Sequence, residues 1–129
     1  MTAKEYLSRI KFLDTVISHK RKELNALHIN SRNKQELNEA NSLEYEIKTE
    51  LSSYYEEKRS IVNQINSLGN FKYAEILYKR YVEFKSLGDI AVEMNYTYQY
   101  IVELHGKAIK AFSKRFGAIF LNEDNKRSG

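Results

Sequence analysis

Apolar residues recur along the first half of the chain at alternating steps of three and four, which is the spacing of a coiled-coil seam. The seam positions are Ala3, Tyr6, Ile10, Leu13, Ile17, Lys20, Leu24 and Leu27, then Leu37, Ala40, Glu44, Ile47, Leu51, Tyr54, Lys58, Ile61, Ile65 and Leu68. They predict two helices of about 26 and 34 residues, separated by the polar residues 30–33. The short connection favours an antiparallel helical hairpin, although such a stripe can also face a second copy of the chain.

Local signals mark the ends of these helices. Thr2 followed by Glu5 has the spacing of a capping box. Gly69 has the residue type suited to a left-handed C-terminal cap after the second helix. The two lysines on the seam, Lys20 and Lys58, weaken the apolar packing locally and are expected to fix the register of the two helices.

After Gly69 the segments become shorter and richer in aromatic residues. Residues 71–83 form an amphipathic pattern that places Ala74, Leu77, Tyr78 and Tyr81 toward a core. Ser86 is the expected N-cap of a second short helix, a turn follows at Asn95-Tyr96, and Thr97 is the expected cap of a third helix. The inward positions of these two helices are Ile90, Ala91, Met94, Ile101, Leu104, Ala108 and Phe112. Two helices separated by a tight turn are typical of a helix-turn-helix.

The expected fold is therefore all-α, consistent with a chain that contains no proline. A long antiparallel, coiled-coil-like helical hairpin covers residues 1–68 and is expected to be a dimerisation or docking arm. A three-helix helix-turn-helix domain covers residues 69–121. Residues 122–129 form a polar tail that is expected to be flexible.

Composition argues against catalytic chemistry. The chain has no cysteine, and its three histidines have no second ligand at the spacing of a known metal motif. The five glycines form no phosphate-binding loop. We therefore expect no enzymatic activity, no catalytic residue, no metal and no cofactor. The charged N-terminus and the absence of a long apolar run predict no membrane association and a location in the cytoplasm.

The charge of the chain is compatible with a nucleic-acid partner. The formal net charge is +4 and the sequence pI is about 9.2, and most of the positive excess lies after residue 68. Lys107, Lys110 and Lys114 recur at steps of three and four, with Arg115 beside them. Such a stripe can hold a phosphate backbone, although it is also what a solvated helix face looks like.

These features carry a resemblance to two groups of transcription proteins. The helix-turn-helix resembles the fourth conserved region of bacterial primary sigma factors, on the residues Leu87, Ile90, Ala91, Thr97, Ile101, Leu104, Lys107, Ala108 and Ile109. The whole chain resembles the phage-encoded ArpU-like late-gene activators, through its start at Thr2–Leu7 and the stretches Tyr78–Tyr81 and Leu104–Ala108. The resemblance implies a DNA-binding transcriptional regulator of a phage or mobile element, associated with the nucleoid of the host cell.

The same resemblance implies which residues contact double-stranded DNA. The third helix would enter the major groove, with a symmetric homodimer reading two half-sites. The implied contact residues are Thr97, Tyr98, Gln99, Tyr100, Val102 and Glu103, together with Lys107, Lys110, Lys114 and Arg115. Sigma factors are rich in arginine over the first of these stretches, whereas this chain has no basic residue there.

The tyrosines suggest an alternative function, protein binding in place of DNA binding. The run Tyr96-Thr-Tyr-Gln-Tyr100 is also typical of a protein-binding surface, because tyrosine is enriched in interfaces. On this interpretation the chain is an inhibitor or adaptor that binds host RNA polymerase, a repressor or a nuclease through a degenerate helix-turn-helix. Nearby, His105 is expected to pack or to donate or accept a hydrogen bond, and Gly106 indicates close approach of a neighbouring helix or a partner.

Overall fold

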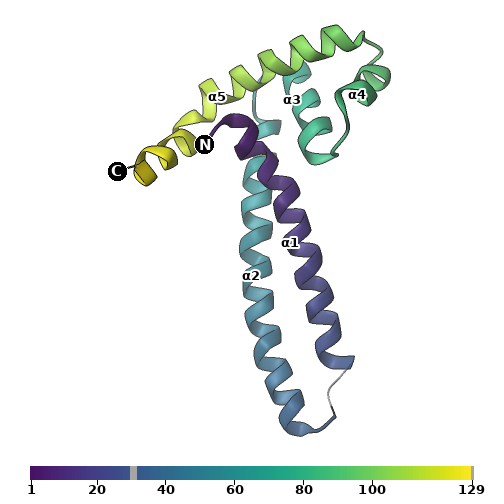
Figure 1. The fold of residues 1–129 in the computed structure, drawn as a ribbon, viewed down its shortest axis with the longest axis vertical. Coiled ribbons are helices and arrows are strands. Elements are labelled where there is room, and N and C mark those ends of the chain that lie inside the picture. Colours follow the sequence, from purple (N-terminus) through teal and green to yellow (C-terminus); the bar gives the residue numbers. More distant parts are fainter. Residues whose placement is uncertain (30–31, 129) are drawn as a thin grey trace. The chain divides into compact units, whose positions relative to one another are not determined.

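The computed structural model describes the backbone of residues 1–29 and 32–128 and the side chains of residues 1–27 and 32–121. Its helices are α1 (Ala3–Ile29), α2 (Lys34–Asn66), α3 (Phe71–Leu77), the π-helix η1 (Tyr78–Val82), α4 (Leu87–Met94) and α5 (Tyr98–Ser128). Figure 1 shows these elements in chain order. The described residues contain no strand, so the all-α prediction is confirmed.

The chain divides into two compact units. One consists of residues 12–59, and the other combines residues 1–11 with residues 60–129. The division therefore falls within α1 and within α2, and differs from the boundary predicted after residue 68. The predicted polar tail, residues 122–129, lies outside the residues whose side chains are described.

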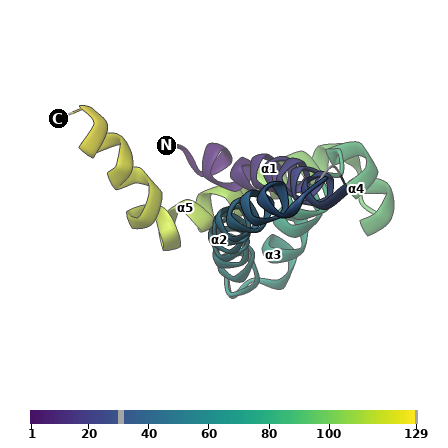
Figure 2. The same cartoon turned by 90° about the horizontal axis from the view of Figure 1, so that it is seen from below.

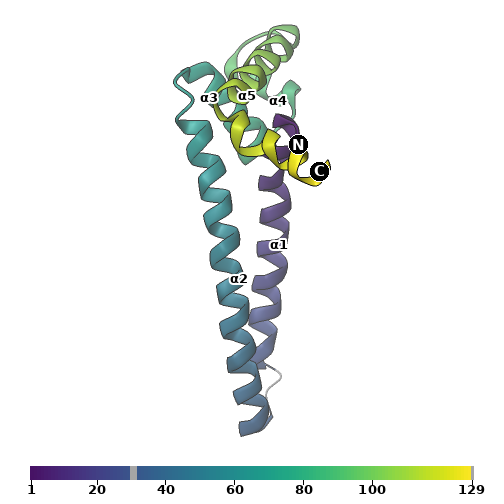
Figure 3. The same cartoon turned by 90° about the vertical axis from the view of Figure 1, so that its left-hand side faces the viewer.

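In the unit formed by residues 12–59, parts of α1 and α2 run alongside each other in opposite directions (Figures 1 and 3) and are seen close to end-on in Figure 2. Ile17, Ile47 and Leu51 form the buried core, against which Leu24, Leu27 and Tyr54 pack. All six are predicted seam positions, so the periodicity identified this core correctly. Leu37 is an exception: it lies near the start of α2 and is 42% exposed.

The two seam lysines form ion pairs between α1 and α2. The Nζ atom of Lys20 lies 2.9 Å from the carboxylate of Glu50, and that of Lys58 lies 2.6 Å from the carboxylate of Asp14. Pairs that are partly open to solvent contribute only about 0–1 kcal/mol each. Their positions on facing helices match the register-fixing role expected for both lysines.

In the other unit, the first turns of α1 pack on aromatic rings of α5. The ring of Tyr6 lies 4.8 Å from that of Phe120 and 6.0 Å from that of Phe112, measured between centroids. The Tyr6 hydroxyl also donates a hydrogen bond to Oε1 of Gln64 in α2, at 2.7 Å. These contacts join residues far apart in the sequence and explain why residues 1–11 belong to this unit.

The turn between α2 and α3 follows its sequence signals. Gly69 has a φ of +90°, as expected for a left-handed cap. Asn70 begins the next helix, because its side-chain oxygen accepts a hydrogen bond from the backbone N–H of Tyr73 at 3.1 Å. At the chain's start, the N–H of Glu5 donates to the hydroxyl of Thr2 at 3.2 Å, which confirms the Thr2 half of the capping box, while the Glu5 carboxylate accepts from that same hydroxyl at 3.2 Å.

The amphipathic helix predicted over residues 71–83 changes to a π-helix in its second half, where Tyr81 is buried as predicted and Tyr78 is not. The backbone N–H of Glu83 donates to the carbonyl of Tyr78 at 3.1 Å, five residues back, and the chain continues as η1. This wider turn puts Tyr81, five residues after Ile76, in the core with it. Tyr78, which the α-helical period placed inward, is instead at the surface, 36% exposed.

Candidate nucleic-acid interface

Capping residues mark both ends of α4 and the start of α5. Ser86 caps α4 by accepting from the N–H of Asp89 at 3.1 Å. Asn95 then ends α4 in the left-handed conformation, with φ at 61° and ψ at 43°. Thr97 caps α5 by accepting from the N–H of Tyr100 at 3.1 Å. All three local predictions are confirmed, and together they fix where α5 begins.

The inward side of α5 is the predicted one. Ile101, Leu104, Ala108 and Phe112 are buried, as are Ile90 and Ala91 of α4. Helices α4 and α5 therefore bury apolar residues at the expected spacing, which leaves the opposite side of α5 open to solvent.

His105 is buried beside these residues and hydrogen-bonded. Its Nε2 atom lies 2.9 Å from the hydroxyl of Tyr81, and the two rings stack with centroids 5.8 Å apart. Burial lowers the pKa of His105, and the nearby charges of Lys4 and Arg80 lower it further. Burial also raises the pKa of Tyr81. The expected packing and hydrogen-bonding role of His105 is confirmed.

The predicted contact residues occupy the solvent side of α5. Tyr98 is 60% exposed and Val102 is 42% exposed. The polar members of the set are exposed as well: Thr97, Gln99, Glu103, Lys107, Lys110, Lys114 and Arg115. At about 100° per residue, Gln99, Glu103 and Lys110 lie nearly in line, and Lys107 and Lys114 lie beside that line. The structure thus brings five of the ten predicted residues onto one exposed strip: Gln99, Glu103, Lys107, Lys110 and Lys114.

The three lysines of this strip form no ion pair with any side chain that the structure describes. Elsewhere in the same unit, Lys79 and Lys85 both bind the carboxylate of Glu93, at 3.3 and 2.7 Å. Ammonium groups without a carboxylate partner remain available to an external anion.

Arg115 lies apart from the lysine strip. Its guanidinium carbon is 5.4 Å from the centroid of the Phe116 ring. A Cβ atom added to Gly69 would lie 3.4 Å from its Nη1 atom. Because neighbouring residues on a helix point about 100° apart, this side chain extends away from the one at Lys114. Arg115 follows Lys114 in the sequence but does not share its face of α5.

Gly106 leaves a gap in the exposed strip. Apart from its two chain neighbours and the nearby backbone of α5 itself, a Cβ atom added at this position would meet no heavy atom of the described residues within 4 Å. The expectation that a neighbouring helix approaches Gly106 is therefore wrong, and the other explanation, approach of a partner, remains a prediction.

Sequence reasoning missed a cation near the start of α5. The Nζ atom of Lys72, in the first turn of α3, lies 5.3 Å from the centroid of the Tyr96 ring. The rings of Tyr96 and Tyr100 are 4.6 Å apart. Hydrogen bonding to Tyr96 is the main cause that raises the pKa of Lys72. No local signal in the sequence indicates this contact, because α3 and the turn before α5 meet only through the fold.

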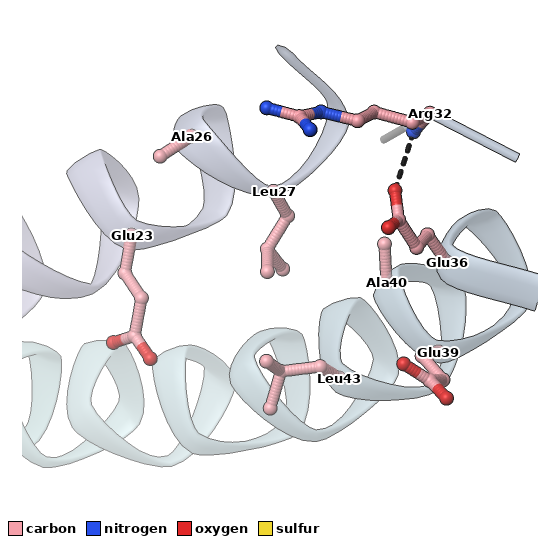
Figure 4. Close-up of a pocket in the computed structure, with 8 residues that line it drawn as sticks. All are labelled: Glu23, Ala26, Leu27, Arg32, Glu36, Glu39, Ala40 and Leu43. Atoms are coloured by element: carbon pink, nitrogen blue, oxygen red, sulfur yellow. Dashed lines mark hydrogen bonds between the residues drawn. The ribbon is translucent and has the colours of Figure 1, made fainter. Parts of the chain in front are cut away.

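A second candidate surface lies where the end of α1 approaches the start of α2. It is a groove of about 570 Å³, in which Leu27 and Leu43 point toward one another (Figure 4). Carboxylates of Glu23 and Glu39 line it, and Glu36 accepts a hydrogen bond from the backbone N–H of Arg32 at 2.6 Å. Arg32 also lines the groove, so its rim carries three carboxylates and one guanidinium around an apolar floor. Such a groove can receive an apolar segment of another protein that carries positive charge.

Comparison with known proteins adds no assignment. No family model matches the chain, and it has no significant match among the curated proteins or the solved structures. Among the described residues, no group of histidine, cysteine, aspartate and glutamate could hold a metal ion. None of the helices in the described ranges is both long enough and apolar enough to cross a membrane.

Proposed function

We propose that this chain is a DNA-binding protein that inserts α5 into the major groove of duplex DNA. Helices α4 and α5, with the turn between them, would act as a helix-turn-helix. The observation that carries the proposal is the exposed strip of α5, where lysines without a carboxylate partner continue the line of Gln99 and Glu103. Basic turns that follow a polar stretch on one helix face suit a helix whose beginning contacts bases and whose later turns contact phosphates.

The exposed side chains of α5, on the strip and beside it, each have a chemical role in this proposal. Gln99 can pair with adenine through two hydrogen bonds, and Glu103 can accept one from the amino group of cytosine. Val102 offers an apolar contact to a thymine methyl group, and Tyr98 can donate to a phosphate. Lys107, Lys110 and Lys114 bind the backbone and supply affinity that does not depend on sequence.

The biological setting is part of the proposal and rests on the sequence resemblance. The chain would regulate transcription for a phage or mobile element in the host cytoplasm, at the nucleoid. The paired segments of α1 and α2 would form a hairpin arm that joins two copies or docks on host RNA polymerase. A homodimer would present two copies of α5 to two half-sites about one helical turn of DNA apart.

The test is duplex binding as a function of salt. We expect the wild-type protein to bind a fluorescently labelled duplex in low salt and to lose affinity steeply as salt rises. The double variant Lys107→Ala with Lys110→Ala should bind more weakly, and its salt slope should fall by about two. The matched control, Lys22→Ala with Lys34→Ala, removes the same charge from exposed positions of α1 and α2 and should bind like the wild type. Absence of duplex binding by the wild type in low salt would contradict the proposal.

The second candidate function is an inhibitor or adaptor of a host protein. The groove between Leu27 and Leu43 and the exposed ring of Tyr98 are the observations in its favour. It predicts a complex with purified host RNA polymerase that survives moderate salt, because apolar contacts are screened little. Tyr98→Ala or Leu43→Ala should weaken this complex. If the protein and the polymerase migrate separately in size-exclusion chromatography, polymerase is not the partner.

A further inference from the structure

The side chains that surround the Lys72 ammonium group come from three separate parts of the chain. Lys72 comes from α3, Tyr96 from the turn after α4, and Tyr100 from the first turn of α5. All three side chains are at the surface, and the two tyrosine rings are 38% and 37% exposed. One ammonium group and two phenol rings therefore lie together on an open surface.

The tyrosine rings hold the Lys72 side chain in place, but they do not neutralise its positive charge. The Tyr96 ring and hydrogen bonding to the two tyrosines occupy part of the ammonium group, whose three N–H donors can also serve an external acceptor. Among the described side chains Lys72 has no carboxylate partner. A lysine that is already held in place loses less conformational freedom when it binds an anion than a free surface lysine does.

Lys72 lies beside the part of α5 that lacks a positive charge. Residues 98–103 carry no basic side chain, and Glu103 would repel a phosphate. Lys72 supplies a positive charge next to that stretch from outside the helix-turn-helix sequence. Phenol hydroxyls are also common donors to phosphate oxygens.

We propose that Lys72, Tyr96 and Tyr100 bind one phosphodiester group of the DNA backbone beside the bases that the start of α5 contacts. The inference rests on the proposed DNA-binding function. Lys72 forms the charge-assisted hydrogen bond and the two hydroxyls donate to the remaining oxygens. This contact anchors the N-terminal end of α5, as the lysine strip anchors its later turns.

The experiment measures binding of a labelled mixed-sequence duplex of about 30 base pairs across a salt series, a length that covers a typical site. Lys72→Gln should weaken binding several-fold and lower the salt slope by about one, because one phosphate contact is lost. Lys72→Arg should keep the slope. The double variant Tyr96→Phe with Tyr100→Phe keeps both rings and removes both hydroxyls, so it should weaken binding and leave the slope nearly unchanged. Lys34→Gln is the charge-matched control and should behave like the wild type.

The outcomes separate this site from the proposed function. If the wild type binds and the Lys107→Ala, Lys110→Ala variant loses slope, but Lys72→Gln keeps the wild-type affinity and slope, the phosphate site is overturned and the DNA-binding function stands. If the wild type does not bind the duplex in low salt, the function fails and the site fails with it. Circular dichroism checks that Lys72→Gln remains helical, and recovery of binding in Lys72→Arg ties its defect to the charge.

Discussion

Replacing Gly106 with alanine should stabilise the protein. Gly106 lies within α5 and is exposed, and an added Cβ would touch no heavy atom of the described residues within 4 Å beyond its chain neighbours and the nearby backbone of α5. The methyl group therefore neither gains nor loses packing, and the change reduces to helix propensity. Alanine is favoured over glycine in a helix interior by about 1 kcal/mol, because the unfolded glycine has more conformational freedom to lose.

The assay is equilibrium unfolding by urea, followed by circular dichroism. The free energy of unfolding of Gly106→Ala should exceed that of the wild type by about 1 kcal/mol, which corresponds to about 3 °C in the midpoint of thermal unfolding. Gly69→Ala is the opposite control. Its φ of +90° is unfavourable for a residue with a Cβ, and Arg115 lies 3.4 Å from the added atom, so it should destabilise the protein by about 1 kcal/mol. If Gly106→Ala fails to stabilise, position 106 is not an open helical site.

Gly106→Ala also tests the proposed DNA contact, because the expected change in duplex affinity is opposite to the change in stability. If the backbone of a duplex approaches α5 closely at Gly106, the added methyl group should reduce duplex affinity while it raises stability. A stabilised variant that binds the duplex as well as the wild type would show that Gly106 is not a position of close approach. Because the two readouts change in opposite directions, loss of binding cannot be attributed to a loss of folded protein.

Three further predictions concern the fold. Burial lowers the pKa of His105 below 6.5, so the unfolded chain takes up a proton before the folded one does, and stability present above pH 6.5 should be lost as the pH falls below that value. Urea unfolding at pH 7.5 and 5.5 should show a smaller pH effect in His105→Gln; an equal effect in both proteins would contradict this assignment. Asn95→Ala should cost about 1 kcal/mol because its φ is 61°, whereas Asn95→Gly should not, as judged by urea midpoints. Ile47→Ala should cost about 2–5 kcal/mol, because the side chain is 1% exposed, whereas Tyr45→Ala, at a ring that is 75% exposed, should cost far less in the same assay.

The parts of the fold that the sequence predicted are those set by local interactions. The seam positions Ile17, Ile47 and Leu51 are buried because a helix repeats its faces every three to four residues, whatever surrounds it. The caps at Ser86 and Thr97 were predictable for the same reason, since each hydrogen bond closes within three residues.

The parts that the sequence did not predict depend on contacts between distant residues. Tyr78 was placed in the core by a period that η1 interrupts, and no residue type marks a π-helical turn in advance. Because Tyr6 packs on Phe120, the first residues of α1 belong to the same unit as α5, and the boundary between the units lies within α1. The contact of Lys72 with Tyr96 likewise exists only once α3 and the turn before α5 are folded together.

The charges along α5 constrain how a duplex can meet it under the proposed function. Glu103 lies on the same exposed strip as Lys107 and Lys110. A carboxylate there would be repelled by phosphates if α5 lay across the DNA backbone, but over base edges it can accept a hydrogen bond from cytosine. The phosphates must then lie to either side of it, near Lys107 and Lys110 at one end and near Lys72 at the other. The arrangement therefore favours a helix that lies in the groove with its first turns on the bases, since only that orientation keeps the single acidic group of the strip away from the backbone.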